Sequence, residues 1–101
     1  MLSIEDIIKA NSDLSANQIE GILQLIYWSK QITNADLIRK TRLPKEVLKR
    51  LKSFLSPVLV EATSDEILFK EEFIKYLESQ ELKPYKWTLL EYASPVLESK
   101  L

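Results

Sequence analysis

The sequence predicts a single, mainly α-helical domain that carries one small β-hairpin. Its 101 residues can build one hydrophobic core but not two. Apolar residues make up 46% of the chain and charged residues 29%, which is the balance of a folded protein. Hydroxyl residues that cap helices recur before apolar positions at helical spacing, and two short β-rich runs interrupt the helical pattern.

The first three helices share one N-terminal signal. Each begins with a serine or threonine that is followed three residues later by an acid or amide, which together form a capping box. Apolar residues flank each box as a hydrophobic staple. The pairs are Ser3 with Asp6, Ser15 with Gln18, and Thr33 with Asp36, and they predict helices at about 4–10, 16–29 and 34–41.

Two more helices and the hairpin follow. Pro44 suits the first position of a helix over 44–55, whose apolar positions are spaced by three and four. The runs "VLVEA" and "ILFK", separated by the polar "TSDE", predict a hairpin over 58–70. Helical spacing then returns over 71–80. An isolated hairpin is marginal in water, so we expect its apolar face to lie on the helices.

Residues 81–101 form a C-terminal segment, helical or extended, beyond the domain of residues 1–80. The segment is rich in leucine and aromatic residues and needs a partner surface. Two interpretations stay open: it packs back on the first two helices near Tyr27 and Trp28, or it forms a homodimer contact or a connection to a further domain. The chain also stops within an apolar-periodic stretch, which is typical of a fragment.

The composition argues against catalysis by this chain. Histidine and cysteine are absent, which removes imidazole bases, thiol nucleophiles and the commonest zinc ligands. The single glycine, Gly21, cannot form a glycine-rich phosphate loop. We therefore expect no catalytic residue, no metal site and no cofactor.

The sequence also predicts a cytoplasmic location. No apolar run approaches the roughly 20 residues that cross a bilayer, and the start "MLSIEDIIKA" lacks the basic region of a signal peptide. The absence of cysteine fits a reducing compartment. We expect no membrane partner.

Positive charge is collected in one stretch. Residues 39–52, "RKTRLPKEVLKRLK", hold seven basic residues and one acid in a chain of net charge -1. Residues 30–56 together carry +6 and the remainder -7. Such a face can bind nucleic-acid phosphates. It can equally be a solvated helix face, or can meet an acidic protein surface, including the acidic half of a second copy.

The order of elements around "ITNADLIRKTRLPKEVLKRLKSFLSPVLVEATSDEILFK" resembles a winged helix-turn-helix domain over about residues 18–80. The resemblance is carried by a helix from Thr33, a short turn through Arg42 and Leu43, a second helix from Pro44, and a hairpin where the family has its wing.

The resemblance implies that 44–55 is the recognition helix and that double-stranded DNA is the partner. Its early exposed residues would face the major groove, and the neighbouring cations would contact phosphates. The implied base-facing residues are Lys45, Glu46, Lys49 and Arg50, and the implied phosphate contacts are Arg39, Lys40, Arg42 and Lys52.

Two positions depart from the family pattern. Arginine stands at position 42, where glycine is frequent, so the turn must either avoid the left-handed conformation or accept strain. The expected wing carries Glu61, Asp65 and Glu66 with only Lys70 to balance them, and acids repel the phosphate backbone.

Three functions are therefore carried forward. The first is the DNA-binding domain of a transcriptional regulator. The alternative is a non-catalytic N-terminal module of a larger methyltransferase-like enzyme, used for docking or dimerisation; the architecture is similar to that of branched-chain polyamine synthases. The third is an interaction module that dimerises through its first helix and C-terminal segment.

Overall fold

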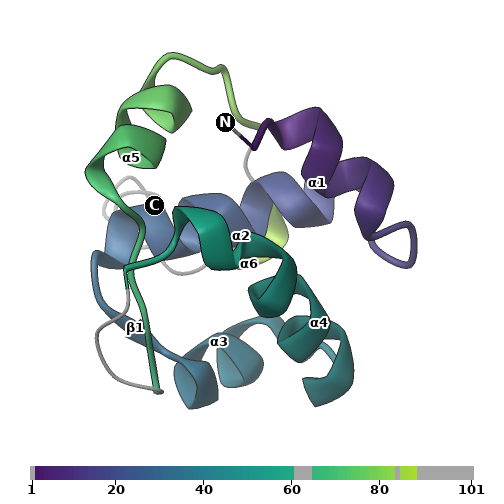
Figure 1. Cartoon of the computed structure of the whole chain (residues 1–101). Helices are drawn as coiled ribbons and strands as arrows, with labels where there is room; N and C mark the ends of the chain where they lie inside the picture. Colours follow the sequence, from purple (N-terminus) through teal and green to yellow (C-terminus); the bar gives the residue numbers. More distant parts are fainter. Residues whose placement is uncertain (1, 61–64, 84, 89–101) are drawn as a thin grey trace, which may run out of the picture.

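The computed structural model describes residues 2–60, 65–83 and 85–88. The chain is mostly helical and contains a small two-stranded antiparallel sheet (Figure 1). The elements follow the order α1 (Ile4–Ala10), α2 (Ala16–Ser29), β1 (Ile32–Thr33), α3 (Asn34–Thr41), α4 (Lys45–Leu55), the 3-10 turn η1 (Ser56–Val58), β2 (Glu66–Ile67), α5 (Glu71–Glu78) and α6 (Lys86–Thr88).

Helix α2 is the centre of the core. Figure 1 shows it crossing the middle of the molecule, between α5 and α3. Its side chains Ile19, Ile22 and Leu23 are fully buried, and Leu25 on another side of the helix is buried as well. A helix that is apolar on most sides is covered on most sides. The other elements are therefore positioned by their contacts with α2 and with one another.

The capping signals place the first three helices where the sequence predicts them. Reciprocal capping boxes form at Ser3 with Asp6 and at Ser15 with Gln18. At α3, the Thr33 hydroxyl oxygen accepts a hydrogen bond from the Asp36 backbone N–H at 3.1 Å. The predicted bounds 4–10, 16–29 and 34–41 are confirmed.

The next two helices differ slightly from the prediction. Pro44 has φ -57° and ψ 139°, so it is the N-cap and α4 begins one residue later, at Lys45. Helix α5 ends at Glu78 rather than at residue 80. The Ser79 N–H bonds back to the carbonyls of Lys75 and Tyr76 and closes that end.

The sheet departs from the predicted hairpin. The arms of the region 58–70 do pair: the Val60 N–H donates to the Leu68 carbonyl and the Lys70 N–H to the Val58 carbonyl, both at 2.8 Å. However, the regular strand β2 pairs with β1, in the register Ile32 with Ile67. The strand β1 was not predicted, and Glu66 lies in β2 rather than in a turn.

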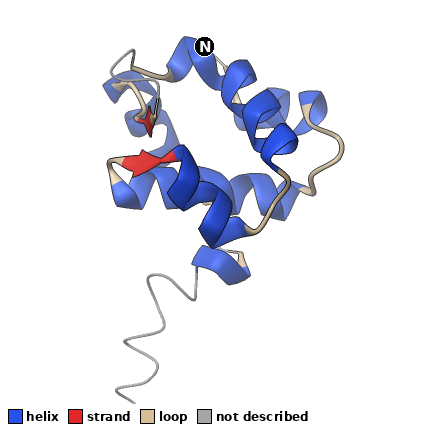
Figure 2. Ribbon diagram, turned by 90° about the horizontal axis from the view of Figure 1, so that it is seen from below, coloured by secondary structure: helices blue, strands red, loops and turns tan. Residues whose placement is uncertain are grey.

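Figure 2 shows both strands (red) together at one side of a molecule that is otherwise built of helices (blue). The prediction that the β-region lies on the helices is confirmed, because Ile67 and Phe69 belong to the common core. Phe69 also contacts Phe73 of α5 edge-on, with ring centroids 4.9 Å apart. Residues 61–64 lie outside the described residues; they include Glu61 of the first predicted strand and the start of the predicted turn.

The described part of the C-terminal segment packs on α2. Trp87 of α6 is 8% exposed and joins the core. The side-chain amide of Gln24 donates to the Leu82 carbonyl at 3.0 Å, and α6 contacts α2. Of the two open interpretations, packing on the chain's own helices is found for Leu82, Tyr85 and Trp87, while 84 and 89–101 lie outside the described residues. No helix in the described part of the chain has both the length and the apolarity to span a membrane.

Candidate nucleic-acid interface

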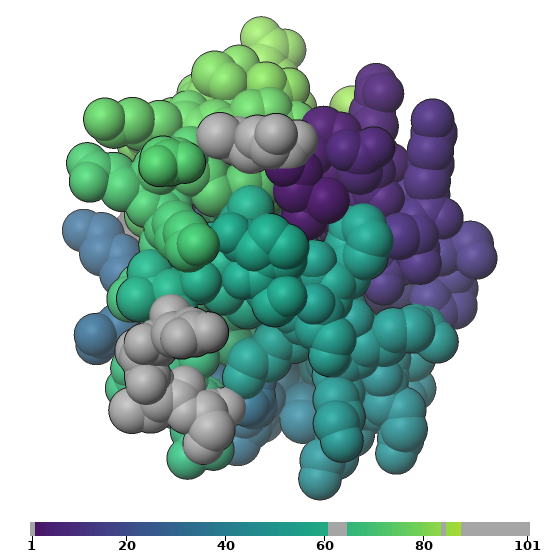
Figure 3. All heavy atoms as spheres, in the orientation of Figure 1, coloured from purple at the N-terminus to yellow at the C-terminus, as the bar shows by residue number. Residues whose placement is uncertain are grey.

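Helix α4 presents a polar face to solvent because its other face is held in the core. Leu48, Leu51 and Leu55 are between 1% and 6% exposed, and they fix the rotation of the helix about its axis. The opposite positions are exposed, namely Lys45, Glu46, Lys49, Arg50 and Ser53. In the space-filling view, the side chains of α4 (teal) project beside the atoms of α1 (purple) (Figure 3).

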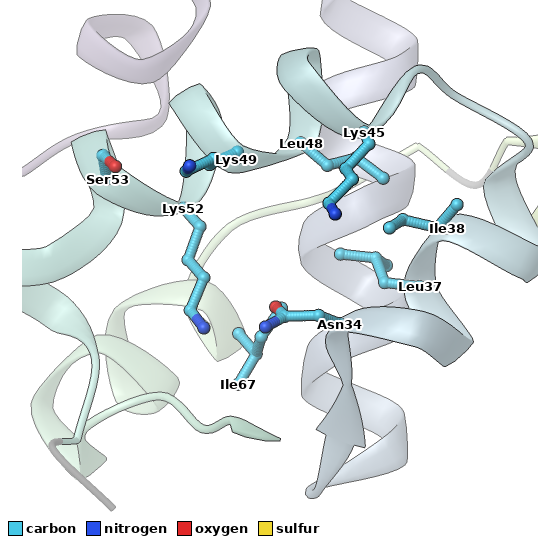
Figure 4. A pocket seen from close by; sticks show the side chains of 9 residues that line it. All are labelled: Asn34, Leu37, Ile38, Lys45, Leu48, Lys49, Lys52, Ser53 and Ile67. Carbon is cyan, nitrogen blue, oxygen red and sulfur yellow. The ribbon is translucent and has the colours of Figure 1, made fainter. Parts of the chain in front are cut away.

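Three of the predicted basic residues gather around one hollow. Lys45, Lys49 and Lys52 follow the spacing of a single helix face and line a hollow of about 370 Å³ between α3, α4 and β2. Its floor is apolar, and its lining is completed by Asn34, Leu37, Ile38, Leu48, Ser53 and Ile67. Figure 4 shows Lys45 and Lys52 extending from α4 across this hollow toward α3. We call these residues together the lysine-rimmed hollow.

The turn that joins α3 to α4 is strained. Arg42 adopts φ 57° and ψ 23°, a left-handed conformation, and its N–H donates to the Ile38 carbonyl at 2.7 Å. Of the two alternatives left by the sequence, strain is therefore the one found. A non-glycine residue in this conformation costs roughly 1–2 kcal/mol. The Arg42 side chain is exposed at the end of α3.

Arg50 is directed to another part of the chain. Its guanidinium forms an ion pair with the carboxylate of Asp13, in the turn between α1 and α2. Both side chains remain substantially exposed, at 56% and 41%. This pair brings an acid next to the predicted recognition helix and partly neutralises one of its cations.

Arg39 and Lys40 lie around an acid of their own helix. Arg39 donates to the Asp36 carboxylate at 3.1 Å, and the Lys40 charge also acts on Asp36. The hydrogen bond from Arg39, followed by that from Thr33, lowers the pKa of Asp36 below its ordinary value of 3.8. The positive charges of Arg39 and Lys40 are therefore shared with Asp36 of α3 and do not simply add to the exposed face of α4.

The acidic neighbours predicted for the wing also lie close to this surface. The Asp65 backbone carbonyl accepts a hydrogen bond from the Asn34 N–H at 2.8 Å, which ties the residue to the start of α3. Its side chain is exposed, and Glu66 is half-buried in β2. Asp65 and Glu66 therefore add negative charge on the β side of the candidate interface.

The seven basic residues predicted for the interface divide into one group and several separate positions. Lys45, Lys49 and Lys52 come together, whereas the structure places Arg39 and Lys40 beside Asp36, Arg42 on the turn and Arg50 beside Asp13.

Sequence reasoning missed two polar residues of the hollow, Asn34 and Ser53. Ser53 follows Lys49 by four residues, so helical spacing could have found it. Nothing local to Asn34 indicates its place there.

Among the described residues, no group of three acidic, histidine or cysteine side chains is arranged to hold a metal ion. The candidate interface therefore consists of cations, an apolar floor and the exposed face of α4. Comparisons of the chain with protein-family models, with curated proteins and with solved structures give no match.

Proposed function

We propose that this chain is a winged helix-turn-helix domain that binds double-stranded DNA as part of a transcriptional regulator. In this proposal α4 enters the major groove and α3 supports it. The wing consists of the β1–β2 pair and the paired arms of the region 58–70. The helical order, the short α3–α4 turn and the antiparallel pairing near residues 58–70 are compatible with that layout.

The observation that carries the proposal is the exposed face of α4. Lys45 and Lys49 stand one helical turn apart on it, and the ion pairs among the described residues involve neither of them. Their ammonium groups can therefore replace the counterions of DNA phosphates or donate to guanine edges. The core contacts of Leu48 and Leu51 hold both lysines on a rigid element, which favours a defined register on the duplex.

The remaining cations are suited to phosphate contacts. Arg42 and Lys52 lie at the two sides of the lysine pair, and each neutralised phosphate adds salt-sensitive affinity. With about four phosphate contacts, log K is expected to fall with log salt at a slope of about -3.6. The acids Asp65 and Glu66 oppose this term and reduce the contribution of the wing.

The test is a fluorescence-anisotropy titration of labelled duplex DNA at several salt concentrations. We expect binding that weakens steeply with salt and is largely lost in the variant Lys45→Glu/Lys49→Glu/Arg50→Glu. A matched variant, Lys9→Glu/Lys75→Glu/Lys83→Glu, changes the net charge equally at exposed positions outside α4. Binding that is insensitive to salt, or equal loss in both variants, contradicts the proposal.

A second function is favoured by a different surface. Trp28 is 42% exposed beside a hollow that Tyr27, Ile74 and Glu78 also line. Exposed aromatic residues are enriched at protein interfaces. We therefore keep the alternative that the chain is a non-catalytic N-terminal module of a larger methyltransferase-like enzyme, where it serves docking or dimerisation rather than DNA reading.

Two observations distinguish this alternative from DNA binding: the length of the reading frame, and self-association measured by analytical ultracentrifugation. It predicts a reading frame that continues past codon 101 into a catalytic domain, and a self-association that the variant Trp28→Ser weakens without unfolding the chain. A monomer at high concentration, in a protein without a downstream domain, would rule it out.

A further inference from the structure

The lysine-rimmed hollow combines two chemical features that DNA binding does not need together. Phosphate contacts require cations but no apolar floor. Here Leu37, Leu48 and Ile67 are between 2% and 6% exposed and form the floor, with half-buried Ile38 beside them. Lys45, Lys49 and Lys52 line the same hollow.

We propose that the lysine-rimmed hollow is a binding site for a small amphiphilic carboxylate, a ligand with one anionic head and an apolar body. The carboxylate would lie among the ammonium groups of Lys45, Lys49 and Lys52. The apolar body would cover the floor between α3 and α4. A volume of about 370 Å³ falls within the range of small-molecule sites.

The chemistry of the lining selects this class of ligand. Lys45 and Lys49 are like charges one helical turn apart and repel one another, so a single carboxylate beside both relieves that repulsion. A small anion without an apolar body would meet only the lysines, of which Lys45 and Lys49 are exposed and screened by salt, and would bind weakly. A neutral apolar molecule would cover the floor but would not neutralise the charge of the lysines. Only a molecule with both parts uses the whole lining.

The two sides of the hollow come from different helices. Figure 4 shows Leu37 and Ile38 reaching into it from α3, whereas Lys45 and Lys52 reach over it from α4. The site therefore depends on the angle between the two helices, which the strained turn at Arg42 connects. A bound ligand would contact both helices at once and stabilise this arrangement.

If α4 also reads DNA, the ligand is a competitor, and this part of the inference rests on the proposed function. Lys45 and Lys49 would serve both the ligand carboxylate and the DNA phosphates. One set of ammonium groups cannot neutralise both, so each ligand lowers the affinity for the other. The hollow would then be an effector site that releases DNA by direct competition.

Ligand binding is tested first without DNA, by titrating the full 101-residue chain with octanoate and following amide chemical shifts by NMR. We expect shifts at residues of α3, α4 and β2, with a dissociation constant on the order of 1 mM. Octanamide has the apolar body without the charge, and acetate has the charge without the body. Both are expected to bind at least tenfold more weakly than octanoate.

Two variants separate the two halves of the site. Lys45→Gln/Lys49→Gln removes the charge, and Ile38→Gln makes the half-buried part of the floor polar; each is expected to weaken octanoate binding at least tenfold. Lys9→Gln/Lys75→Gln is the matched control and should leave it unchanged. Circular dichroism confirms that every variant is folded. Equal binding of octanamide, shifts confined to the surface around Trp28, or no shift at about tenfold above the expected constant would overturn the proposal.

The competition is tested by adding octanoate to the anisotropy assay. We expect it to raise the apparent dissociation constant for duplex DNA in the wild-type chain and not in the Ile38→Gln variant. If the chain binds octanoate but no DNA, the proposed function fails and the ligand site stands. If octanoate fills the hollow without changing DNA affinity, the competitive role is wrong.

Discussion

Arg50 of α4 is joined by an ion pair to Asp13 of the turn between α1 and α2. The two residues are 37 positions apart in the chain, so the contact connects the candidate interface to the N-terminal part of the domain. An exposed pair of this kind contributes less than about 1 kcal/mol to folding. Under the proposed function, the pair withholds one positive charge from the DNA phosphates.

The variant Asp13→Asn should therefore bind DNA more tightly than the wild type. It releases Arg50 for one further phosphate contact, which we expect to make the salt slope steeper by up to about 0.9. The matched control Glu81→Gln removes the same charge from an exposed position outside α4 and its neighbours. Equal gains in both variants in the anisotropy assay would assign the effect to net charge rather than to Arg50.

Lys30 offers a test of backbone strain at the end of α2. It has a positive φ of 61° at the C-cap of α2. Glycine is the residue most often found with a positive φ at helix C-termini. Lys30→Gly should stabilise the fold by about 0.5–1 kcal/mol and raise the melting temperature. Lys30→Ala removes the same charge but keeps the Cβ atom, so it should give no such gain in thermal unfolding.

A single hydroxyl links α5 to the start of α1. The Tyr76 hydroxyl oxygen accepts a hydrogen bond from the Ile4 backbone N–H at 3.0 Å. Tyr76→Phe should lower the free energy of unfolding by about 1 kcal/mol and speed amide exchange in α1. The comparison is Tyr27→Phe, which loses an exposed hydrogen bond to Glu78 and should change the urea midpoint less. Equal losses in the two variants contradict this assignment.

Two acids in the first turns of helices, Asp6 in α1 and Asp36 in α3, predict that the free energy of unfolding falls at acid pH. Hydrogen bonds from the Ser3 backbone and hydroxyl lower the pKa of Asp6, and those from Arg39 and Thr33 lower the pKa of Asp36, in each case from 3.8. A lowered pKa in the folded state gives stability that is present above the unfolded value and is lost as the pH falls through the folded value.

Urea unfolding between about pH 5 and pH 2 measures this effect. The wild-type midpoint should fall as the pH decreases through that window, and the double variant Asp6→Asn/Asp36→Asn should show a smaller fall. A parallel decline in both proteins would show that other groups cause the acid sensitivity.

The sequence predicted most of the helical structure because its signals are local. Each capping partner of Ser3, Ser15 and Thr33 stands three residues away, so short-range spacing suffices to place the start of a helix. The gathering of Lys45, Lys49 and Lys52 also follows from the period of a single helix.

The features that the sequence missed depend on contacts between distant segments. Strand β1 is only Ile32–Thr33, and it is a strand because it meets Glu66–Ile67. A two-residue run carries no alternating pattern of its own. For the same reason, the pairing of Arg50 with Asp13 and the place of Asn34 in the hollow could not be predicted from local spacing.

An NMR titration with a short DNA duplex tests the proposed binding of DNA to the exposed face of α4. We predict that the largest amide shifts fall on Lys45, Glu46, Lys49 and Ser53 and that they shrink as salt is raised. An absence of binding at low salt, or shifts centred on Trp28, would contradict the claim.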